Sequence, residues 1–479
     1  MKNLLLLLLL ISKFSLAQIR VSENKRTLET LDGKPFFWLG DTDWELFHRL
    51  TREETEIFLE TRKKQGFNVI QAVALAEFDG LRKPNRYNDK PLVDNNPTIL
   101  NTSPGNNPAD SLAYDYWDHV DFVFETAALK GLYIGFLPTW GDKLTHLWGD
   151  GPIVFNVENA KIYGRILGKR YGKFNNLIWI LGGDRPVKYK GYDGNDYNDL
   201  AIWRAMAEGI KQGEDLSGSV HHFMTYHHAG GEIRTSNFLQ DETWLELNSF
   251  QSGHGSRESE PWKWVKDDLA KTPQKPTFDM EPCYEDHPVN PWDGTWTKAR
   301  GYFDDYDVRA RVYRSVFAGA AGVTYGHHHI WQFVNTALNP PVYVADTVIP
   351  WQIAMNAKGA NQMKFLKELI LRKANFNRIS GDDLILSDKG SSYKNTIIGT
   401  KAEDNNYALF YMPEPKMVSI DVQKIQGNKL QITYFNPENG QQTSKNIRKK
   451  NAKKVFSPPN GAKDWVLIIE NLSKINGKK

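Results

Sequence analysis

Two carboxylates stand directly after short apolar runs in this chain. Asp184 follows the run in WILGGDRP (179–186), and Glu281 ends the run that leads into DMEP (279–282). Hydrolysis of a glycosidic bond needs two carboxyl groups that flank it. One protonates the leaving oxygen, and the other attacks the anomeric carbon or activates water. If the fold brings these two acids together, they predict glycosidase chemistry. Either acid alone could instead be a buried ion-pair partner, as Asp184 would be with Arg185.

Other polar and aromatic residues stand at or near the ends of these and the other apolar runs and are candidates for contacts with a bound sugar. Carboxylates, imidazoles and amides can hydrogen-bond hydroxyl groups, and an aromatic ring offers an apolar face to a sugar. These candidates are Asp41, Asp43, Trp44, Trp140, Asp142, Arg185, Tyr226, His227, Gln251, His254, Glu285, Tyr325 and His328. For Tyr226 and His227 the alternative is an ordinary polar rim.

The run His327–His329 raises the alternative of a metal-dependent hydrolase, since imidazoles are zinc ligands. In a strand, His327 and His329 would share one face and His328 would lie on the other. Metal-dependent barrels of the amidohydrolase kind carry His-x-His after the first strand, where this chain has Asp41–Asp43. We therefore expect no catalytic metal and no cofactor, and we expect these histidines to hydrogen-bond a sugar or the nucleophile, or to pack. Cys283 is interpreted as a packing residue rather than a thiol nucleophile.

Eight short apolar runs, each followed by polar or small residues, predict the strands that must position these side chains. They are Phe37–Trp44, Phe67–Leu75, Leu132–Trp140, Leu177–Asp184, His222–His228, Leu245–Gln251, Pro276–Glu281 and Val323–His329. Repeated strand–helix alternation predicts an α/β fold, a (β/α)8 TIM barrel, in which catalytic groups stand at the carboxyl ends of the strands. An open doubly wound sheet is the less favoured alternative, because no glycine-rich phosphate fingerprint follows the first run.

Helical patterns lie between the apolar runs. One begins with the capping box Thr51–Glu54, and another covers 116–130 and closes at Gly131. Further patterns cover 159–171, 202–210, 308–321 and 364–372. From about residue 378 onward the chain changes to short alternating runs separated by turns. This change predicts a catalytic barrel over 18–377 and a small all-β sandwich over 378–479. The basic run 445–454 predicts a solvated loop or hairpin, with a patch for acidic polymers as the alternative.

The first residues, MKNLLLLLLLISKFSLAQ, have the charged start, leucine run and small-x-small site of a secretory signal peptide. We expect cleavage after Ala17 and a secreted or periplasmic protein. The apolar run is too short to span a bilayer, and no later segment is long and apolar enough, so no membrane span is expected. The net charge of +3 argues against a nucleic-acid partner, and the single cysteine excludes an internal disulfide framework.

Several segments resemble the apiosidase-like glycoside hydrolases, glycoside hydrolase family 140. They are FFWLGDTDWELFHRLTREE, GFNVIQAVAL, LPTWGDK, IWILGGDRP, DMEPCYE and VTYGHHHIW. YFNPENG (434–440) is similar to a turn in the C-terminal module named "putative collagen-binding". The resemblance covers nearly the whole mature chain. It implies a retaining enzyme with Asp184 as acid/base and Glu281 as nucleophile. It also implies a carbohydrate partner, with cleavage at apiose in the side chains of the pectin rhamnogalacturonan II.

A retaining mechanism sets two conditions on the pair. The carboxyl groups should lie roughly 5–5.5 Å apart. Asp184 must also stay protonated near neutral pH, so burial and the charge of Glu281 should raise its pKa, which Arg185 opposes unless its side chain points away. Gly182 and Gly183 are interpreted as letting a sugar approach the strand end.

Two alternatives stay open at the level of sequence. One is a glycosidase of the same fold that acts on another plant or microbial polysaccharide. The other is a non-catalytic carbohydrate-binding surface protein that uses its C-terminal domain. The exact linkage, endo or exo action, and the oligomeric state do not follow from the sequence.

Overall fold

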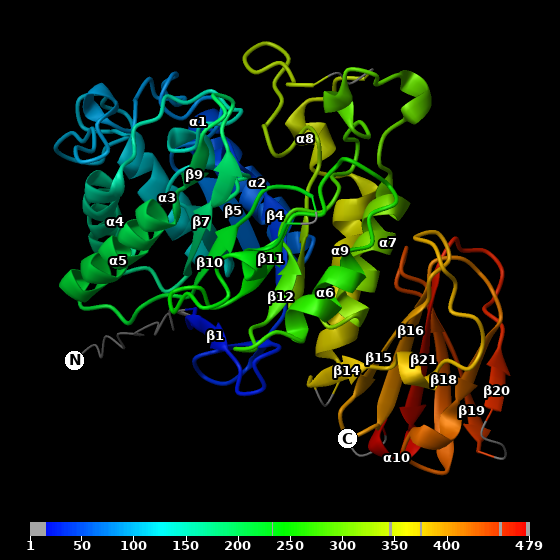
Figure 1. Ribbon diagram of the computed structural model, residues 1–479. Coiled ribbons are helices and arrows are strands. Elements are labelled where there is room, and N and C mark those ends of the chain that lie inside the picture. The colour runs from blue at the N-terminus through cyan, green and yellow to red at the C-terminus, as the bar shows by residue number, and fades with distance from the viewer. Residues whose placement is uncertain (1–15, 232, 344–346, 374–375, 450–452, 476–479) are drawn as a thin grey trace, which may run out of the picture.

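The computed structural model describes residues 16–231, 233–343, 347–373, 376–449 and 453–475. The expected signal peptide falls mainly on residues 1–15, outside the described residues. A barrel of parallel strands and helices forms the first part of the chain, and an antiparallel β domain follows it (Figure 1). Among the described residues, none of the helices combines the length and apolar character needed to cross a membrane.

Eight strands form the barrel, and each overlaps one of the predicted runs. They are β4 (Trp38–Thr42), β5 (Val69–Val73), β6 (Tyr133–Leu137), β7 (Leu177–Gly182), β10 (Met224–His227), β11 (Asn248–Phe250), β12 (Thr277–Asp279) and β13 (Gly322–Tyr325). Six pair in the order β10-β7-β6-β5-β4-β13, and β11 pairs with β12. A parallel bridge between Thr225 and Leu247 links the two groups on one side. On the other side the amide of Ala321 donates to the carbonyl of Thr277. The ring of strands confirms the predicted barrel.

Helices cover the outside of the barrel (Figure 1). They are α1 (Leu46–Arg49), α2 (Arg52–Lys64), α3 (Tyr116–Lys130), α4 (Val157–Tyr171), α5 (Leu200–Ser217), α6 (Pro261–Leu269), α7 (Asp305–Phe317), α8 (Trp351–Ala354) and α9 (Lys358–Leu371). The capping box of Thr51 and Glu54 is present at the start of α2. Helix α3 ends as predicted, because Gly131 adopts the left-handed conformation with φ of 78°.

Short strands lie at both ends of the barrel. Strands β1 (Ile19–Val21), β2 (Leu28–Thr30) and β3 (Pro35–Phe36) form a small antiparallel sheet at the amino ends of the barrel strands. Strands β8 (Lys188–Lys190) and β9 (Asp196–Asn198) form an antiparallel hairpin inside the long loop that follows β7.

The C-terminal domain is built from antiparallel strands, as the alternating runs predicted. One sheet has the order β14-β15-β16-β21-β18-β19, and β17 pairs with β20. Their bounds are β14 (Arg378–Ser380), β15 (Ile398–Ala402), β16 (Tyr407–Met412), β17 (Val418–Asp421), β18 (Lys429–Phe435), β19 (Gln442–Arg448), β20 (Lys453–Phe456) and β21 (Trp465–Asn471), followed by α10 (Leu472–Ile475).

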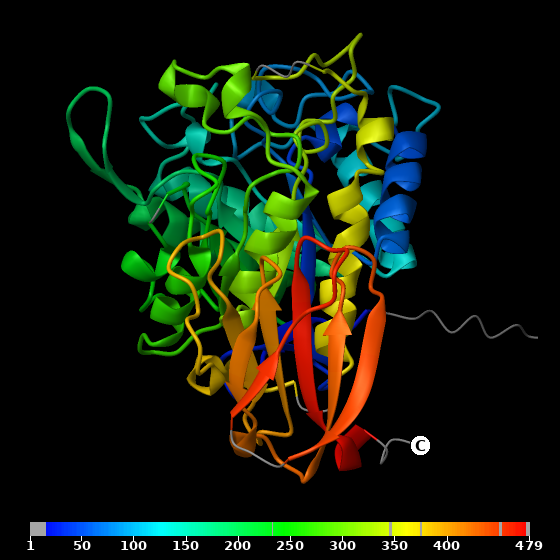
Figure 2. The same cartoon turned by 90° about the vertical axis from the view of Figure 1, so that its right-hand side faces the viewer.

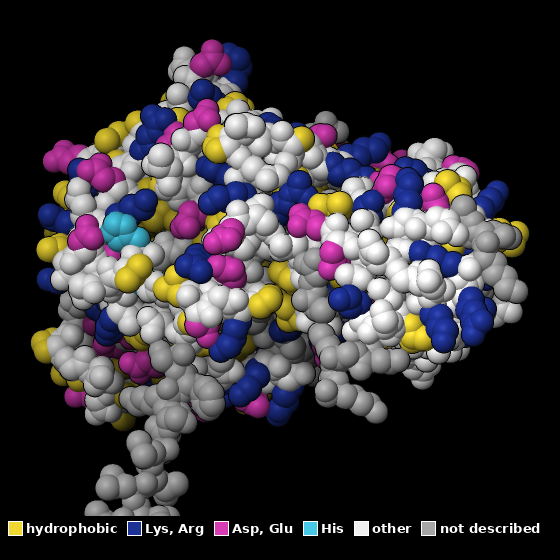
Figure 3. Space-filling view, turned by 90° about the horizontal axis from the view of Figure 1, so that it is seen from below, with side chains coloured by type: hydrophobic (Ala, Val, Ile, Leu, Met, Phe, Trp, Pro, Cys, Tyr) yellow, Lys and Arg dark blue, Asp and Glu magenta, His cyan; other side chains and the backbone are white. Residues whose placement is uncertain are grey.

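The basic run 445–454 is not the loop or single hairpin that the sequence indicated. Its first residues belong to β19 and its last to β20, and these two strands pair with different partners. The side chains of β19 are mostly exposed. Seen from below, Lys and Arg side chains are spread over the visible surface of both domains (Figure 3).

The two domains share a buried interface. The C-terminal domain lies directly against the barrel (Figure 2), and one apolar cluster contains side chains of both. Tyr313 of α7 stacks on Tyr411 of β16 with ring centroids 5.2 Å apart. Beside them, the Arg309 guanidinium lies 2.8 Å from the Asp464 carboxylate, which also accepts a hydrogen bond of 2.8 Å from the Tyr411 hydroxyl. Both ion-pair partners are fully buried.

Replacement of Asp464 by asparagine is expected to lower the free energy of unfolding by about 2–4 kcal/mol, because it leaves the buried charge of Arg309 without its main partner. The amide oxygen of the asparagine can still accept from Tyr411, which places the loss toward the lower end of that range. Denaturant unfolding followed by tryptophan fluorescence measures it. Lys463→Ala is the matched control, because Lys463 forms an exposed pair with Asp304 and exposed pairs contribute little. Equal stability of the two variants would contradict the prediction.

Candidate active site

A cavity of about 990 Å³ lies at the carboxyl ends of the barrel strands. Catalytic sites occupy this end in barrels of this kind. Six of the residues predicted to serve catalysis or substrate binding line the cavity, and they come from five different strand ends. These six residues are Trp44, Trp140, Asp184, Gln251, His254 and Glu281.

The backbone turns sharply where β7 delivers Asp184 to the cavity. Gly182, Gly183 and Asp184 all have positive φ, at 91°, 117° and 52°. Aspartate tolerates this left-handed conformation better than most residues do. A Cβ at Gly182 would lie 2.2 Å from the carbonyl oxygen of His227, and one at Gly183 would lie 2.9 Å from Cα of Trp140. Neighbouring protein backbone fills this space, so the idea that the glycines admit a sugar is wrong.

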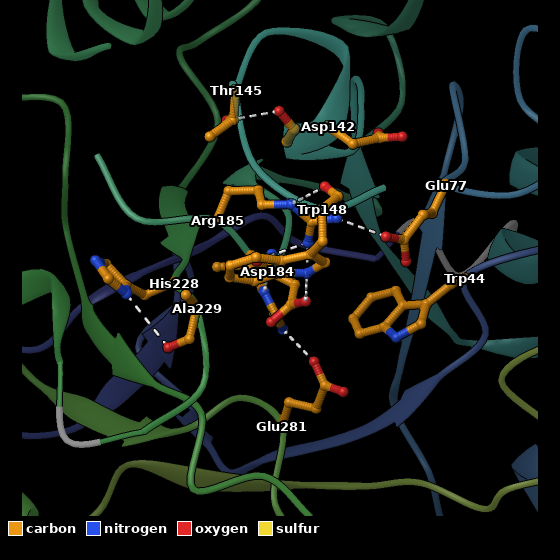
Figure 4. Close-up of polar contacts among 12 residues, drawn as sticks. Trp44, Glu77, Asp142, Thr145, Trp148, Asp184, Arg185, His228, Ala229 and Glu281 are labelled. Carbon is orange, nitrogen blue, oxygen red and sulfur yellow. Dashed lines mark hydrogen bonds and ion pairs between the residues drawn. The ribbon is translucent and has the colours of Figure 1, made fainter. Parts of the chain in front are cut away.

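Asp184 lies between a cation and a second carboxylate. Its Oδ2 accepts hydrogen bonds from Arg185 Nη1 at 2.9 Å and from the Trp148 indole at 3.3 Å (Figure 4). Burial raises the pKa of Asp184, the Arg185 charge lowers it, and the charge of Glu281 raises it again, with a raised pKa as the net result. Arg185 therefore does point toward Asp184. Arg185 Nη2 lies 2.6 Å from Glu77 Oε1, so the guanidinium charge is shared between two carboxylates.

Glu281 is surrounded by hydrogen-bond donors. Its Oε1 accepts from the Tyr284 hydroxyl at 2.6 Å and from His254 Nε2 at 3.2 Å. Its Oε2 lies 2.9 Å from His227 Nε2. Burial alone would raise the pKa of Glu281, but the contacts with His227 and His254 outweigh burial and lower this pKa to about 2. Glu281 is therefore ionised at neutral pH.

One imidazole connects the two acids. The backbone amide of Asp184 donates to His227 Nδ1 at 3.1 Å. This contact leaves the ring proton on Nε2, which faces Glu281. His254 is fixed in the same way, because the amide of Tyr284 donates to its Nδ1 at 3.2 Å. Both rings thus direct Nε2 toward Glu281.

The environments of Asp184 and Glu281 shift their pKa values in opposite directions. Asp184 is held toward its protonated form, and Glu281 is held as a carboxylate. Two carboxyl groups with separated pKa values are the pattern by which acid/base and nucleophile roles are assigned in glycosidases. Within this cavity Asp184 can therefore protonate a leaving oxygen, and Glu281 can attack an anomeric carbon.

Nine predicted substrate-binding residues do not line the cavity. They are Asp41, Asp43, Asp142, Arg185, Tyr226, His227, Glu285, Tyr325 and His328. All are buried at relative exposures of 6% or less. At these positions the structure shows side chains packed behind the residues that line the cavity, and their contact with a sugar stays a prediction.

The partners of these nine residues explain their burial. Asp41 pairs with Arg62, and Asp142 pairs with Lys143. Arg185 and His227 hold the catalytic candidates themselves, as described above. Tyr226 donates to the carbonyl of Arg185 at 3.2 Å.

Glu285, Tyr325 and His328 lie in the wall between the last two strands. Glu285 accepts hydrogen bonds from the Tyr325 hydroxyl at 2.7 Å and the amide of Gly359 at 2.9 Å. The His328 ring packs edge-on against His287, with centroids 4.9 Å apart. Asp43 is fully buried and lies close enough to Asp41 for that charge to raise its pKa, in addition to the larger effect of burial.

The histidine run lies outside the strand that was expected to contain it, because β13 ends at Tyr325. Asp286, His327 and His329 form the one group found among the described residues whose potential ligand atoms lie together, within 4.8 Å of one another. The amide of His329 donates to His327 Nδ1 at 3.1 Å, which places the ring proton on Nε2. That nitrogen lies 3.3 Å from Asp286. A hydrogen bond thus accounts for the contact between His327 and Asp286, and none of the three residues lines the cavity.

Several cavity residues were missed by sequence reasoning. They are chiefly Glu77, Trp148, Tyr284, His287, Trp292 and Tyr343. Glu77 stands shortly after β5, and naming the acid behind every apolar run would have found it. Tyr284 lies within the segment that contains Glu281. The others come from long loops, where no spacing rule places a side chain.

Replacement of Glu77 by glutamine is expected to move the alkaline limb of the kcat/KM pH profile about one unit lower. Activity falls as pH rises through the raised pKa of Asp184, because the acid then loses its proton. Burial raises the pKa of Glu77 to about 7, so its negative charge develops as the pH rises through neutrality. Without that charge, Arg185 acts on Asp184 alone and lowers the pKa of Asp184. Glu53→Gln, on the exposed face of α2, is the control. A limb that stays in place or moves upward would refute this role for Glu77.

Comparisons with known proteins identify the chain's family. The family described as "Apiosidase-like, catalytic domain" matches residues 22–377. The domain described as "Putative collagen-binding domain of a collagenase" matches residues 380–470. No curated protein matches the chain.

Solved structures give the same result. A structure described as a glycoside hydrolase is 32% identical, covers 95% of this chain and 97% of its own, and has a TM-score of 0.82. A glycoside hydrolase of family 5 from Bacteroides vulgatus is 31% identical, with coverages of 95% and 93% and a TM-score of 0.80. A structure described as "a putative glycoside hydrolase" from Bacteroides vulgatus, at 13% identity, shares the fold, with coverages of 96% and 83% and a TM-score of 0.65.

Proposed function

Since the chain belongs to the apiosidase-like glycoside hydrolases, we propose that it is a retaining apiosidase acting on plant pectin. The proposed bond is that of apiose in the side chains of rhamnogalacturonan II. The observation that carries the two-carboxylate chemistry is the pair of Asp184 and Glu281, which share one cavity and have oppositely shifted pKa values. The retaining outcome is what the family resemblance implies. The substrate follows from the family resemblance.

In the first step, ionised Glu281 attacks the anomeric carbon. Asp184 gives its proton to the oxygen of the departing group, so the glycosidic bond breaks as a glycosyl–Glu281 ester forms. The donors around Glu281 hold it in one orientation. Their hydrogen bonds also weaken its nucleophilicity, and that cost is offset because the same contacts keep it deprotonated.

In the second step, the carboxylate of Asp184 takes a proton from water. The resulting hydroxide equivalent attacks the anomeric carbon and releases the sugar from Glu281 with its original configuration. Asp184 is then protonated again and ready for the next cycle.

Aromatic side chains support a carbohydrate ligand. Trp44 and Trp140 line the cavity, and their ring centroids lie 5.1 Å apart. Trp148 and Trp292 also line it, and their relative exposures are 42% and 50%. Indole faces pack against the C–H face of a sugar ring, while the neighbouring polar groups bind hydroxyls.

We also propose that the protein is exported. The leader over 1–17 would be removed after Ala17. The mature protein would then consist of a catalytic domain over 18–377 and a β domain over 378–479. Export fits a polymer substrate that the cell does not contain.

A panel of rhamnogalacturonan II side-chain oligosaccharides, incubated with the purified protein, tests the substrate. Release of a product cut at apiose, with retained anomeric configuration by early-time NMR, is the expected result. Hydrolysis of other glycans together with inactivity on every apiosyl substrate would overturn the proposed substrate and leave the glycosidase intact.

A further inference from the structure

The β8–β9 hairpin carries an exposed aromatic side chain beside the cavity. Tyr192 stands in the turn of this hairpin, within the loop that begins at Asp184. It is 77% exposed and nevertheless contributes to the cavity lining. A large aromatic ring that is both exposed and directed along a cavity is a candidate contact for a ligand that extends out of that cavity.

The hairpin is held firmly by stacked rings. The Tyr197 ring lies between His146, at a centroid distance of 4.3 Å, and Tyr189, at 5.3 Å, with interplanar angles of 14° in both cases. The Tyr189 hydroxyl donates to Asp199 at 2.9 Å and accepts from the amide of His146 at 3.0 Å. The turn that bears Tyr192 is thus fixed before a ligand arrives, which reduces the entropy lost on binding.

The turn itself is also tied together. The amide of Gly191 donates to the carbonyl of Asn195 at 2.8 Å, and the Tyr197 hydroxyl donates to Asp193 at 2.6 Å. The backbone of Tyr192 therefore has little freedom, although its side chain is open to solvent.

The reaction indicates which part of the substrate meets this hairpin. Asp184 protonates the oxygen of the departing group, so the sugar attached to that oxygen lies on the side of Asp184 and its loop. Trp148 is on this side too, because its indole donates to Asp184 and its ring stacks over Arg185 at 4.4 Å (Figure 4). Trp148 lies next to the acid in the loop that follows β6, and Tyr192 lies in the loop that follows β7. The amide of Tyr192 donates to the carbonyl of His146 at 3.4 Å, so the two loops are in contact, and both residues line the cavity.

We propose that Tyr192 and Trp148 form the binding site for the departing carbohydrate, with Tyr192 as the contact for a sugar beyond the first. This proposal rests on the proposed function only in that the substrate is a glycoside. The protein then prefers a bond inside an oligosaccharide side chain to the same sugar on a small leaving group.

The test compares Tyr192→Ala with the wild type on two substrates that share the cleaved sugar. One is an aryl glycoside, and the other is an oligosaccharide extended by at least two sugars on the departing side. The loss of kcat/KM is expected to be about tenfold greater for the oligosaccharide than for the aryl glycoside, mostly through KM. Tyr192→Phe keeps the ring and should retain most of the preference.

Equal losses on both substrates, or no loss on either, would overturn the proposal, provided that the circular dichroism and melting temperature of the variant match the wild type. The outcome is separable from that of the proposed substrate. If the wild type cleaves a different sugar, the same pair of substrates is made with that sugar, and the ratio of losses still tests Tyr192.

Discussion

Replacement of Glu281 by glutamine is expected to lower kcat by about 10⁴-fold or more, which corresponds to a barrier higher by about 5 kcal/mol. The amide cannot form the glycosyl ester, so the two-step route is closed. Glutamine has nearly the same shape as glutamate and can still accept the hydrogen bond from Tyr284. The fold and sugar binding should therefore survive. Rates on an aryl glycoside, with substrate affinity measured by calorimetry, separate the loss of chemistry from a loss of binding.

Gln251 provides the matched control for this experiment. It lines the same cavity but touches neither acid in the hydrogen bonds of the described residues. Gln251→Ala is expected to change KM more than kcat. If Glu281→Gln kept more than a few per cent of the wild-type kcat, the nucleophile would have to be another group.

Replacement of Asp184 by asparagine is expected to reduce kcat by about 10²–10⁴-fold on a natural oligosaccharide, whose departing hydroxyl is a poor leaving group and needs a proton. Asparagine tolerates the left-handed backbone conformation at this position, so the turn after β7 should be unchanged. On an aryl glycoside with an acidic phenol the first step needs no proton. The loss in that step should be far smaller.

Added azide gives this prediction a second readout. Azide attacks the glycosyl ester without help from a base, so it should speed turnover of the Asp184→Asn variant and yield a glycosyl azide of retained configuration. The product is identified by NMR. Equal losses on both leaving groups and no effect of azide would mean that Asp184 is not the acid/base.

The barrel could be predicted because every strand is an apolar run closed by a polar or small residue. The run Leu177–Asp184 and strand β7 differ by two residues. The helices that began with capping residues, such as α2 and α3, were placed well. Helix α6 was missed, because Pro261–Leu269 has only 9 residues and therefore offers few turns of periodic pattern. The end of the eighth strand was misplaced, because three histidines after Tyr325 give no sign of where pairing stops.

The site was only partly visible in the sequence for a related reason. A rule that collects polar residues after strands finds Asp184 and Asp41 equally well. It cannot tell that Asp184 turns into the cavity while Asp41 turns toward Arg62 behind it. The direction of Asp184 depends on the positive φ angles of residues 182–184. The residue types in the sequence do not reveal these angles. The positions of the Trp148 and Tyr343 side chains depend on the paths of long loops, and these paths could not be predicted from the sequence.

The buried contact of Arg309, Tyr313, Tyr411 and Asp464 has a consequence for how this enzyme meets a polymer. A binding module on a flexible linker searches a volume around its enzyme and recruits it in many orientations. Here the β domain is fixed to the barrel, so its outer surface keeps one distance and one angle to the cavity mouth. A carbohydrate chain resting on that surface would enter the cavity along one set path. Transfer of this domain to another enzyme would therefore carry over its surface but not its fixed distance and orientation relative to a cavity.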